Sequence, residues 1–280
     1  MQFDKIFDIS LIYATFRSAT PIIYAALCAA ITQQADILNI GTEGIMLTGA
    51  FTAVTVSYFT GSWVLGILIS MVAGLLIAMI MAVGHIKYKA EICAIGMGIN
   101  LFAIAFTKFM LNSVLGVSGS FTSPQIKGIP KVHMPFLDGV PVLDSLFNNW
   151  SVTEWFVIVL MFLFYKTVWG LRLRAVGQFP MAAETAGINV NAMKYQAIAI
   201  SGLIGGLAGA HLSLGYSQLF TEGMTNSRGF MGVAAMYFGG AHPALTAVGC
   251  LIFGFTDSLG ARIPYPPACR CSICPISHLA

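Results

Sequence analysis

The sequence has 280 residues, of which 57% are hydrophobic and only 9% are charged. Soluble globular domains carry about 25% charged residues, so this composition excludes an ordinary water-exposed surface. The net charge of +3 is small and is not gathered into a basic patch with aromatics, so nucleic acid is not expected as a partner. Residues 1–10 lack the basic start and short apolar core of a cleaved signal peptide. The chain is therefore expected to be a multi-pass protein of the lipid membrane.

Apolar runs divide the chain into segments, most of them near the length of roughly 20 residues that crosses a hydrocarbon core. In chain order the expected segments are 19–33, 37–59, 63–84, 92–111, 152–168, 195–214, 229–240 and 245–261. The segment 229–240 is too short to cross alone, so it is expected to be a half-helix or one arm of a broken helix. The predicted fold is all-α, a polytopic transmembrane helical bundle, and it occupies residues 1–263.

The distribution of lysine and arginine predicts which loops face the cytoplasm. Loop 85–91 carries two lysines and loop 170–194 carries three basic residues, whereas the longer stretch 112–150 carries only two. The positive-inside rule therefore places the first two loops in the cytoplasm and 112–150 outside, where four prolines predict irregular structure. Counting back through three spans places the N-terminus outside, but Arg17 favours the opposite side, so the orientation of that end stays open.

Polar side chains at membrane depth are costly, so those inside the apolar runs are expected to face protein or water. Asp36, Asn39 and Glu43 are spaced i, i+3 and i+7, which places them on one face if the segment is helical. Such a face would line a pathway. Alternatively, Asp36 and Asn39 form a tight turn at the membrane surface and Glu43 organises the bundle. Asn100 is expected to make an interhelical hydrogen bond, with pore lining as the alternative.

Two overlapping pairs of glycines, each pair four residues apart, lie in segment 195–214. The small-xxx-small pairs are Gly202 with Gly206, and Gly205 with Gly209. Because this pattern lets a neighbouring helix approach closely, we interpret all four as helix-packing residues. His211 follows on the same helix and is expected to be an ordinary hydrogen-bonded histidine.

The loop between the fifth and sixth apolar segments predicts a short helix outside the membrane. Residues 170–190 read GLRLRAVGQFPMAAETAGINV. Pro180 suits the first turn of a helix over residues 181–186, and Gly187 can end that helix in a left-handed conformation. Such a helix either lies on the lipid surface or docks into a groove of a partner. Ala182 and Ala183 favour docking, because small side chains carry little apolar mass to anchor in lipid.

This loop resembles the cytoplasmic coupling loop of the permease subunits of ABC importers, in the branch that carries nucleosides and simple sugars. Three other stretches resemble the same branch in consistent order: ADILNIGTEGIMLTGAF at 35–51, EICAIGMGINLFA at 91–103 and SRGFMGVAAMYFGGAHP at 227–243. The resemblance covers about residues 17–262. Sugar-transporting relatives tend to have Asp-Leu-Ser where this chain has Asn39-Ile-Gly-Thr-Glu43, which favours nucleosides as the substrate.

The resemblance implies a mechanism and a set of partners. Two permease subunits, identical or similar, would form the pathway in the inner (cytoplasmic) membrane. Two separate ATPase subunits would drive it, and an extracytoplasmic substrate-binding lipoprotein would deliver the substrate. By position, the residues expected to contact the ATPase are Ala182, Ala183, Glu184 and Gly187. Glu43 and Asn100 match family positions within the spans, without an implied contact with substrate.

No catalytic residue, metal or cofactor is assigned to this chain. The sequence contains no G-x-x-x-x-G-K-[ST] phosphate loop, so ATP hydrolysis is expected in a partner subunit.

Residues 264–280 depart from the family pattern, in which another apolar run follows a stretch like GFTDSLGARI. Three of the six cysteines and four of the eleven prolines fall within these residues. Our hypothesis is a reading-frame change or truncation near Arg262. The alternative is a zinc site in a Cys-x-Cys-x-x-Cys arrangement, with Cys269, Cys271, Cys274 and His278 as ligands.

Two other classes of function compete with the importer. Gly116-Val-Ser118-Gly119 looks like the nucleophile motif of an intramembrane serine protease, with His242 as the base, but no apolar span opens at Ser118. A secondary transporter or channel is the other alternative, for which an inverted repeat would be the expected sign, and none is visible in the two halves.

Overall fold

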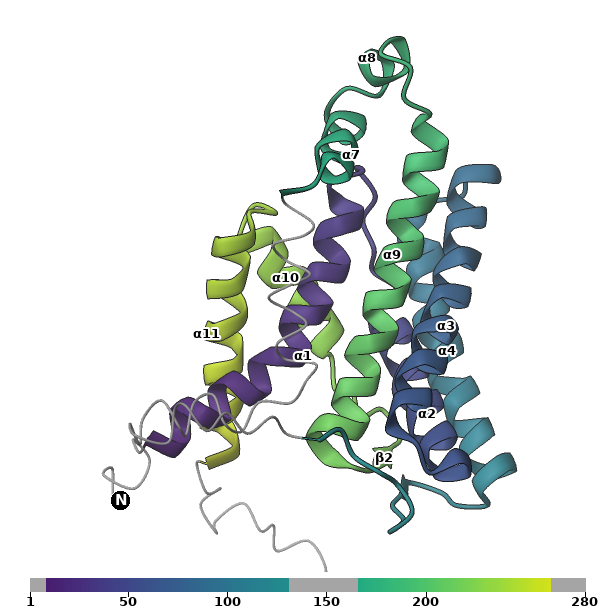
Figure 1. Cartoon of the computed structure of the whole chain (residues 1–280), viewed down its shortest axis with the longest axis vertical. Helices are drawn as coiled ribbons and strands as arrows, with labels where there is room; N and C mark the ends of the chain where they lie inside the picture. Colours follow the sequence, from purple (N-terminus) through teal and green to yellow (C-terminus); the bar gives the residue numbers. More distant parts are fainter. Residues whose placement is uncertain (1–8, 131–165, 263–280) are drawn as a thin grey trace, which may run out of the picture.

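The computed structural model describes residues 9–130 and 166–262, and within these ranges the chain is a bundle of helices (Figure 1). The α-helices are α1 (Ile9–Gln33), α2 (Thr42–Thr60), α3 (Trp63–Ala82), α4 (Ile92–Leu115), α7 (Val168–Gln178), α8 (Pro180–Thr185), α9 (Val190–Ala210), α10 (Arg228–Phe238) and α11 (Pro243–Arg262). The π-helical segments η2 (Val83–Lys87) and η4 (His211–Ser217) extend α3 and α9. Two short strands, β1 (Ser120–Phe121) and β2 (Phe220–Thr221), pair antiparallel. The predicted all-α polytopic bundle is confirmed.

Four helices in the described ranges are long and apolar enough to cross a membrane: Leu11–Gln33, Trp63–Lys87, Ile92–Leu115 and Val190–Ser217. The apolar windows of the first and last are 78% and 83% buried, against 28% for the other two. The helices α1 and α9 therefore form the centre of the bundle, while α3 and α4 present apolar side chains outward. Helix α10 has 11 residues, about 17 Å at 1.5 Å per residue, so it cannot cross alone and the predicted half-helix is confirmed.

Two helix boundaries differ from the sequence expectation. Helix α1 begins at Ile9 rather than near residue 19, because Arg17, which interrupts the apolar run, donates to the carbonyl of Tyr216 and does not end the helix. Helix α2 begins at Thr42 rather than near residue 37. The expected segment 152–168 lies outside the described residues except for its last three, and the tail 264–280 lies wholly outside them.

Close packing around α9 comes from its glycines. Gly202 and Gly206 lie against α3, and a β-carbon at Gly206 would stand only 2.3 Å from the carbonyl oxygen of Ser70. Gly205 and Gly209 lie against α2, where the helices are equally close. The Ser70 hydroxyl donates to the carbonyls of both Gly206 in α9, at 2.7 Å, and a residue of α2, at 2.9 Å. The three helices therefore meet with almost no side-chain material between their backbones.

The loops separate to the two ends of the bundle (Figure 1). The turn after η2 and the helix α8, which carry the basic loops, lie toward one end, and β1 and β2 lie at the other. We name them the cytoplasmic and outer ends, after the sides that the positive-inside rule predicts for their loops. The start of α1 lies toward the outer end.

Candidate functional site

Helix α8 is the part of the described chain that extends farthest from the cytoplasmic end of the bundle (Figure 1). It follows α7, whose Leu173 and Val176 are buried and hold that helix against the bundle. Pro180 occupies the first turn of α8, and Gly187 follows its end with φ of 81°. Both backbone expectations from the sequence are confirmed, and the helix covers Pro180–Thr185.

The surface formed by α8 and the residue before it is more apolar than was predicted from the sequence. Met181 is 84% exposed and Phe179 is 72% exposed. Ala183 is buried within the chain, so in this arrangement a partner would meet Ala182 and Glu184 but not Ala183. These two large apolar side chains flank Pro180 directly, but they were not among the residues predicted to contact a partner. Phe179 and Met181 together give this short helix an exposed apolar surface.

The polar residues expected at membrane depth gather around the start of α2. Residues 37–41 are not helical, so Asp36, Asn39 and Glu43 do not share one helix face. Asp36 is exposed in the turn that ends α1, with φ of 58°. The other two side chains are buried and bond to other helices of the chain.

Asn39 joins the break before α2 to both central helices. Its side chain is fully buried, and its amide nitrogen Nδ2 donates to the hydroxyl of Ser201 in α9 at 3.0 Å. The thiol of Cys28 in α1 lies 2.9 Å from the same hydroxyl. A buried amide with this bond fixes the course of the chain between α1 and α2.

Asn100 joins α4 to the same region. Its Oδ1 accepts from the backbone N–H of Gly44 at 2.8 Å, and its Nδ2 donates to the carbonyl of Ile40 at 3.0 Å. The two bonds span the entry and the first turn of α2. They are contacts between elements of one chain, which is the bundle role considered for Asn100.

Glu43 holds the half-helix α10. It lies in the first turn of α2 and is only 8% exposed. Its Oε1 accepts from the backbone N–H of Ser227 at 3.0 Å, and its Oε2 accepts from that of Gly229 at 2.7 Å. A carboxylate at a helix N-terminus satisfies orphan N–H groups and complements the helix dipole. The start of α2 is thus tied to α9 by Asn39, to α4 by Asn100 and to α10 by Glu43.

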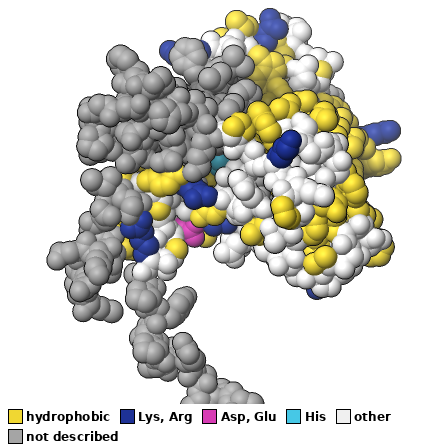
Figure 2. Space-filling model, turned by 60° about the horizontal axis from the view of Figure 1, so that its bottom comes forward, with side chains coloured by type: hydrophobic (Ala, Val, Ile, Leu, Met, Phe, Trp, Pro, Cys, Tyr) yellow, Lys and Arg dark blue, Asp and Glu magenta, His cyan; other side chains and the backbone are white. Residues whose placement is uncertain are grey.

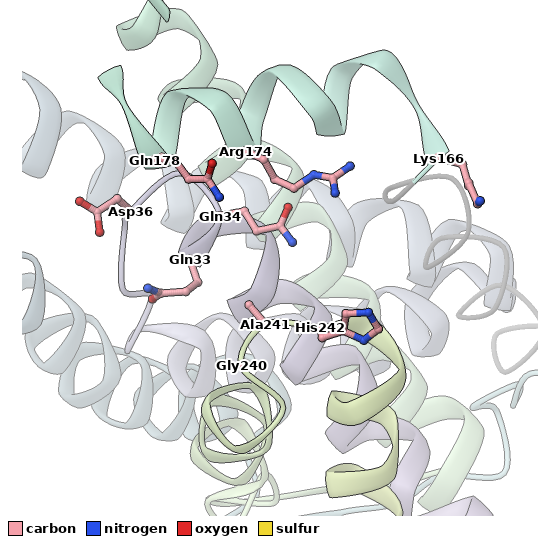
Figure 3. A pocket seen from close by; sticks show the side chains of 10 residues that line it. Gln33, Gln34, Asp36, Lys166, Arg174, Gln178, Gly240, Ala241 and His242 are labelled. Carbon is pink, nitrogen blue, oxygen red and sulfur yellow. The ribbon is translucent and has the colours of Figure 1, made fainter. Parts of the chain in front are cut away.

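A second polar cluster, which the sequence did not predict, lies toward the outer end. Arg17 donates to the carbonyl of Tyr216 at 2.5 Å, and its guanidinium lies 4.6 Å from the centre of the Tyr216 ring. Arg228 lies 5.8 Å from the same ring and pairs with Asp257 at 3.2 Å. Figure 2 shows basic and acidic side chains beside one another on this end. Arg17 is therefore held by protein groups, which explains how α1 accommodates it.

Glu222 anchors the segment that directly follows α4. Its carboxylate accepts from the backbone N–H of Gly119 at 3.0 Å and pairs with Lys108 at 3.3 Å. The hydrogen bond from Gly119, followed by the one from Lys108, lowers the pKa of Glu222 below its ordinary value of 4.5. These contacts link the end of α4 to the turn after β2.

Ser118 and His242, the nucleophile and base of the rival protease, do not come together in the described structure, and the zinc ligands proposed within 269–278 lie outside the described residues. The hydroxyl of Ser118 donates to Oδ1 of Asn112 at 2.6 Å, toward the outer end. His242 lies at the opposite end, beside the turn that ends α1. Within residues 9–130 and 166–262, no group of three or more His, Cys, Asp or Glu side chains could hold a metal ion.

Comparison with known proteins gives one family for residues 11–270 of the chain. The family model described as the permease component of branched-chain amino acid transport systems matches residues 11–270. The guanosine ABC transporter permease protein NupQ of Bacillus subtilis is 36% identical over 269 residues, which cover 91% of this chain and 83% of the relative. The nucleoside ABC transporter permease protein NupC of Lactococcus lactis is 32% identical, with 88% and 81% covered. No solved structure matches the chain.

A third relative, whose name gives a different substrate, has the same identity to this chain as the Lactococcus permease. The putative glucose ABC transporter permease protein TsgC13 of Haloferax volcanii is 32% identical over 264 residues, which cover 91% of this chain and 78% of the relative. The three relatives are therefore all named as ABC transporter permeases, but their names give different solutes.

Fold, membrane-spanning helices and family together define the class. The protein is a multi-pass membrane protein and a transport subunit. The chain belongs to the family of permease components of branched-chain amino acid transport systems, and it is a permease subunit of an ABC importer. The resemblance seen in the sequence is confirmed.

Proposed function

We propose that this chain and a second permease subunit form the pathway of a nucleoside importer in the cytoplasmic membrane. Separate ATPase subunits would dock on α8, and an extracytoplasmic binding lipoprotein would deliver the substrate. The single observation that carries the proposal is the similarity to the guanosine permease over 91% of this chain. The Asn39-to-Glu43 stretch, which differs from the pattern typical of sugar permeases, also favours a nucleoside.

The exposed surface of α8 supports the docking of an ATPase. Met181 and Phe179 are large apolar side chains left in water at the cytoplasmic end, where covering them would stabilise a complex. Glu184 is exposed on the same helix and offers a charged contact beside them. A central apolar anchor with polar groups around it is the usual composition of a binding hot spot.

A movement of the docked helix α8 would be passed to the membrane helices that form the pathway. Helix α8 follows α7 after a single residue, Phe179, and continues through a short turn into α9. Helix α9 packs against α1, α2 and α3 through its glycines and Ser201. A displacement of α8 would therefore reach the start of α2 through rigid, closely packed helices.

Co-purification tests the docking. The chain is co-expressed with its candidate ATPase, solubilised in mild detergent and recovered by an N-terminal tag. Replacing Phe179 and Met181 with Ser, or Glu184 with Lys, should lower recovery of the ATPase at least about tenfold. Tyr88→Ser is the matched control, because Tyr88 is also an aromatic residue, 72% exposed, near the same end. Equal recovery with all these variants would refute docking on α8.

A further inference from the structure

The first part of α1 lies outside the apolar clusters that hold the bundle together. We call residues 9–20 the outer arm, which is about 18 Å long at 1.5 Å per residue. Within the described ranges, the apolar clusters that join the helices include α1 only from Ile22 onward. Ala19 of the arm lies against Gly254 of α11, where an added β-carbon would stand 2.6 Å from that of Ala19. The arm is therefore expected to move with the end of α11, at a lower cost in free energy than the core.

A proline separates the outer arm from the rest of α1. Pro21 has no N–H, so the helical hydrogen bond to the carbonyl of Arg17 cannot form at this point. Figure 1 shows that α1 is bent and that its first part runs away from α9. Beyond the bend, α1 is fixed to α9 by Cys28 and Ser201, whose sulfur and hydroxyl oxygen are 2.9 Å apart. Since sharp bends in helices usually lie at prolines, Pro21 is the expected hinge of the outer arm.

Tyr216 connects the outer arm to the end of α9. Helix α9 continues directly into η4, which contains Tyr216 and is π-helical, a rare form that is frequent at functional sites. Arg17 of the arm donates to the Tyr216 carbonyl at 2.5 Å, and its guanidinium lies 4.6 Å from the centre of the ring. Arg228 of α10 lies 5.8 Å from the same ring and pairs with Asp257 of α11. The ring therefore has the guanidinium groups of two other helices beside it.

These contacts are of a kind that breaks and re-forms. The side chains of Arg228 and Asp257 are 15% and 30% exposed, and Arg17 and Tyr216 are also only partly buried. Partly exposed cation–π contacts and ion pairs are weak compared with a buried apolar interface. The outer arm is thus held to η4 by polar contacts that can be released without disrupting an apolar cluster.

We propose that the outer arm swings about Pro21 to open the outer end of the pathway, and that the contacts of Arg17 and Arg228 with Tyr216 are the latch that keeps it closed. In the structure the latch is closed. The role of this opening in transport rests on the proposed function: a displacement of α8 reaches η4 through α9 and moves Tyr216 relative to the two arginines. The latch itself does not rest on it and is measured on the permease alone.

The test measures the distance between the outer arm and the end of α2 in the purified permease in nanodiscs. Spin labels are introduced by genetic code expansion at Ile12, which is 47% exposed, and at Thr60, the exposed last residue of α2. The wild type should show mainly the distance of the closed structure. Tyr216→Leu, which removes the ring, should raise the ratio of open to closed molecules about two- to thirtyfold, the range for losing one cation–π contact. Tyr216→Phe is the matched control, because it keeps an aromatic ring and should match the wild type.

Two further measurements separate a latch from general damage to the fold. A label pair at Thr60 and Tyr88, two exposed residues at opposite ends of the α2–α3 pair, should keep its distance in every variant. Arg17→Met, which removes the guanidinium, should open the arm as Tyr216→Leu does, and it serves if that variant does not fold. An unchanged distance between Ile12 and Thr60 in both variants, equal opening in Tyr216→Phe and Tyr216→Leu, or a changed distance between Thr60 and Tyr88 would overturn the latch.

The complex with the ATPase subunits tests the coupling. Adding a non-hydrolysable ATP analogue should change the ratio of open to closed molecules in the wild type and leave it unchanged in Tyr216→Leu, because the ring that transmits the movement is missing. An assembled complex in which the analogue has no effect on the wild type would overturn the coupling and leave the latch standing. Failure of the ATPase to bind would overturn the proposed function and the coupling that rests on it, but not the latch.

Discussion

Removing the Glu43 carboxylate should destabilise the bundle at the start of α10. The carboxylate accepts two backbone N–H groups at the start of α10, at 3.0 and 2.7 Å, and is 8% exposed. In Glu43→Gln one oxygen remains as an acceptor, while the new amide NH₂ faces an N–H donor. One buried N–H then loses its partner, and the other exchanges a charged acceptor for a neutral one.

The expected loss follows from these two changes. A hydrogen bond to a charged group contributes about 1.5–3 kcal/mol, and a neutral one about 1 kcal/mol. Losing one charged bond and weakening the other should therefore lower the free energy of unfolding by about 3 kcal/mol, to within a factor of two. Since α10 packs against α1 and α11, the effect should appear as early opening of that side of the bundle.

The assay is unfolding of the purified permease in mixed micelles by added denaturing detergent, read as free energy at a fixed micelle composition. Glu91→Gln is the matched control. Glu91 also caps a helix, accepting from the N–H of Ala94 at 2.7 Å, but it is exposed, so its replacement should cost much less. If the two variants were equally stable, the role assigned to Glu43 at α10 would be wrong.

Two further predictions concern packing and pH. Gly206→Ala should destabilise the fold by about 1–3 kcal/mol through overlap with Ser70, whereas Gly98→Ala, with no atom near its new methyl group, should be neutral or mildly stabilising in the same unfolding assay. Because the pKa of Glu222 is lowered in the folded chain, its contribution to stability is present above 4.5 and is lost as the pH falls through the folded value. The difference in melting temperature between wild type and Glu222→Gln should therefore shrink below that pH. A difference that stays the same at all pH values would contradict the assignment.

Features set by neighbouring residues could be predicted from the sequence. The position of α8 followed from Pro180 and Gly187, because a fixed φ and a left-handed end act locally. The length of α10 followed from the short apolar run, and the composition alone indicated membrane helices.

Features set by distant residues could not be predicted. The partners of Glu43 are 184 and 186 residues away in the sequence, and nothing near Glu43 indicates which helix end it caps. Arg17 interrupted the apparent first span for the same reason, since its partner Tyr216 is 199 residues away. The spacing of Asn39 and Glu43 suggested one helix face, but the chain breaks between them and directs each toward a different neighbour.

ATP-driven uptake measures the proposed function most directly. The permease, its ATPase subunits and the binding lipoprotein are reconstituted in proteoliposomes, and accumulation of labelled guanosine is followed with and without ATP on the ATPase side. The account predicts guanosine accumulation that requires ATP and is abolished when Phe179 and Met181 are replaced by Ser. Accumulation that an ion gradient drives without the ATPase, or uptake of glucose in preference to guanosine, would contradict it.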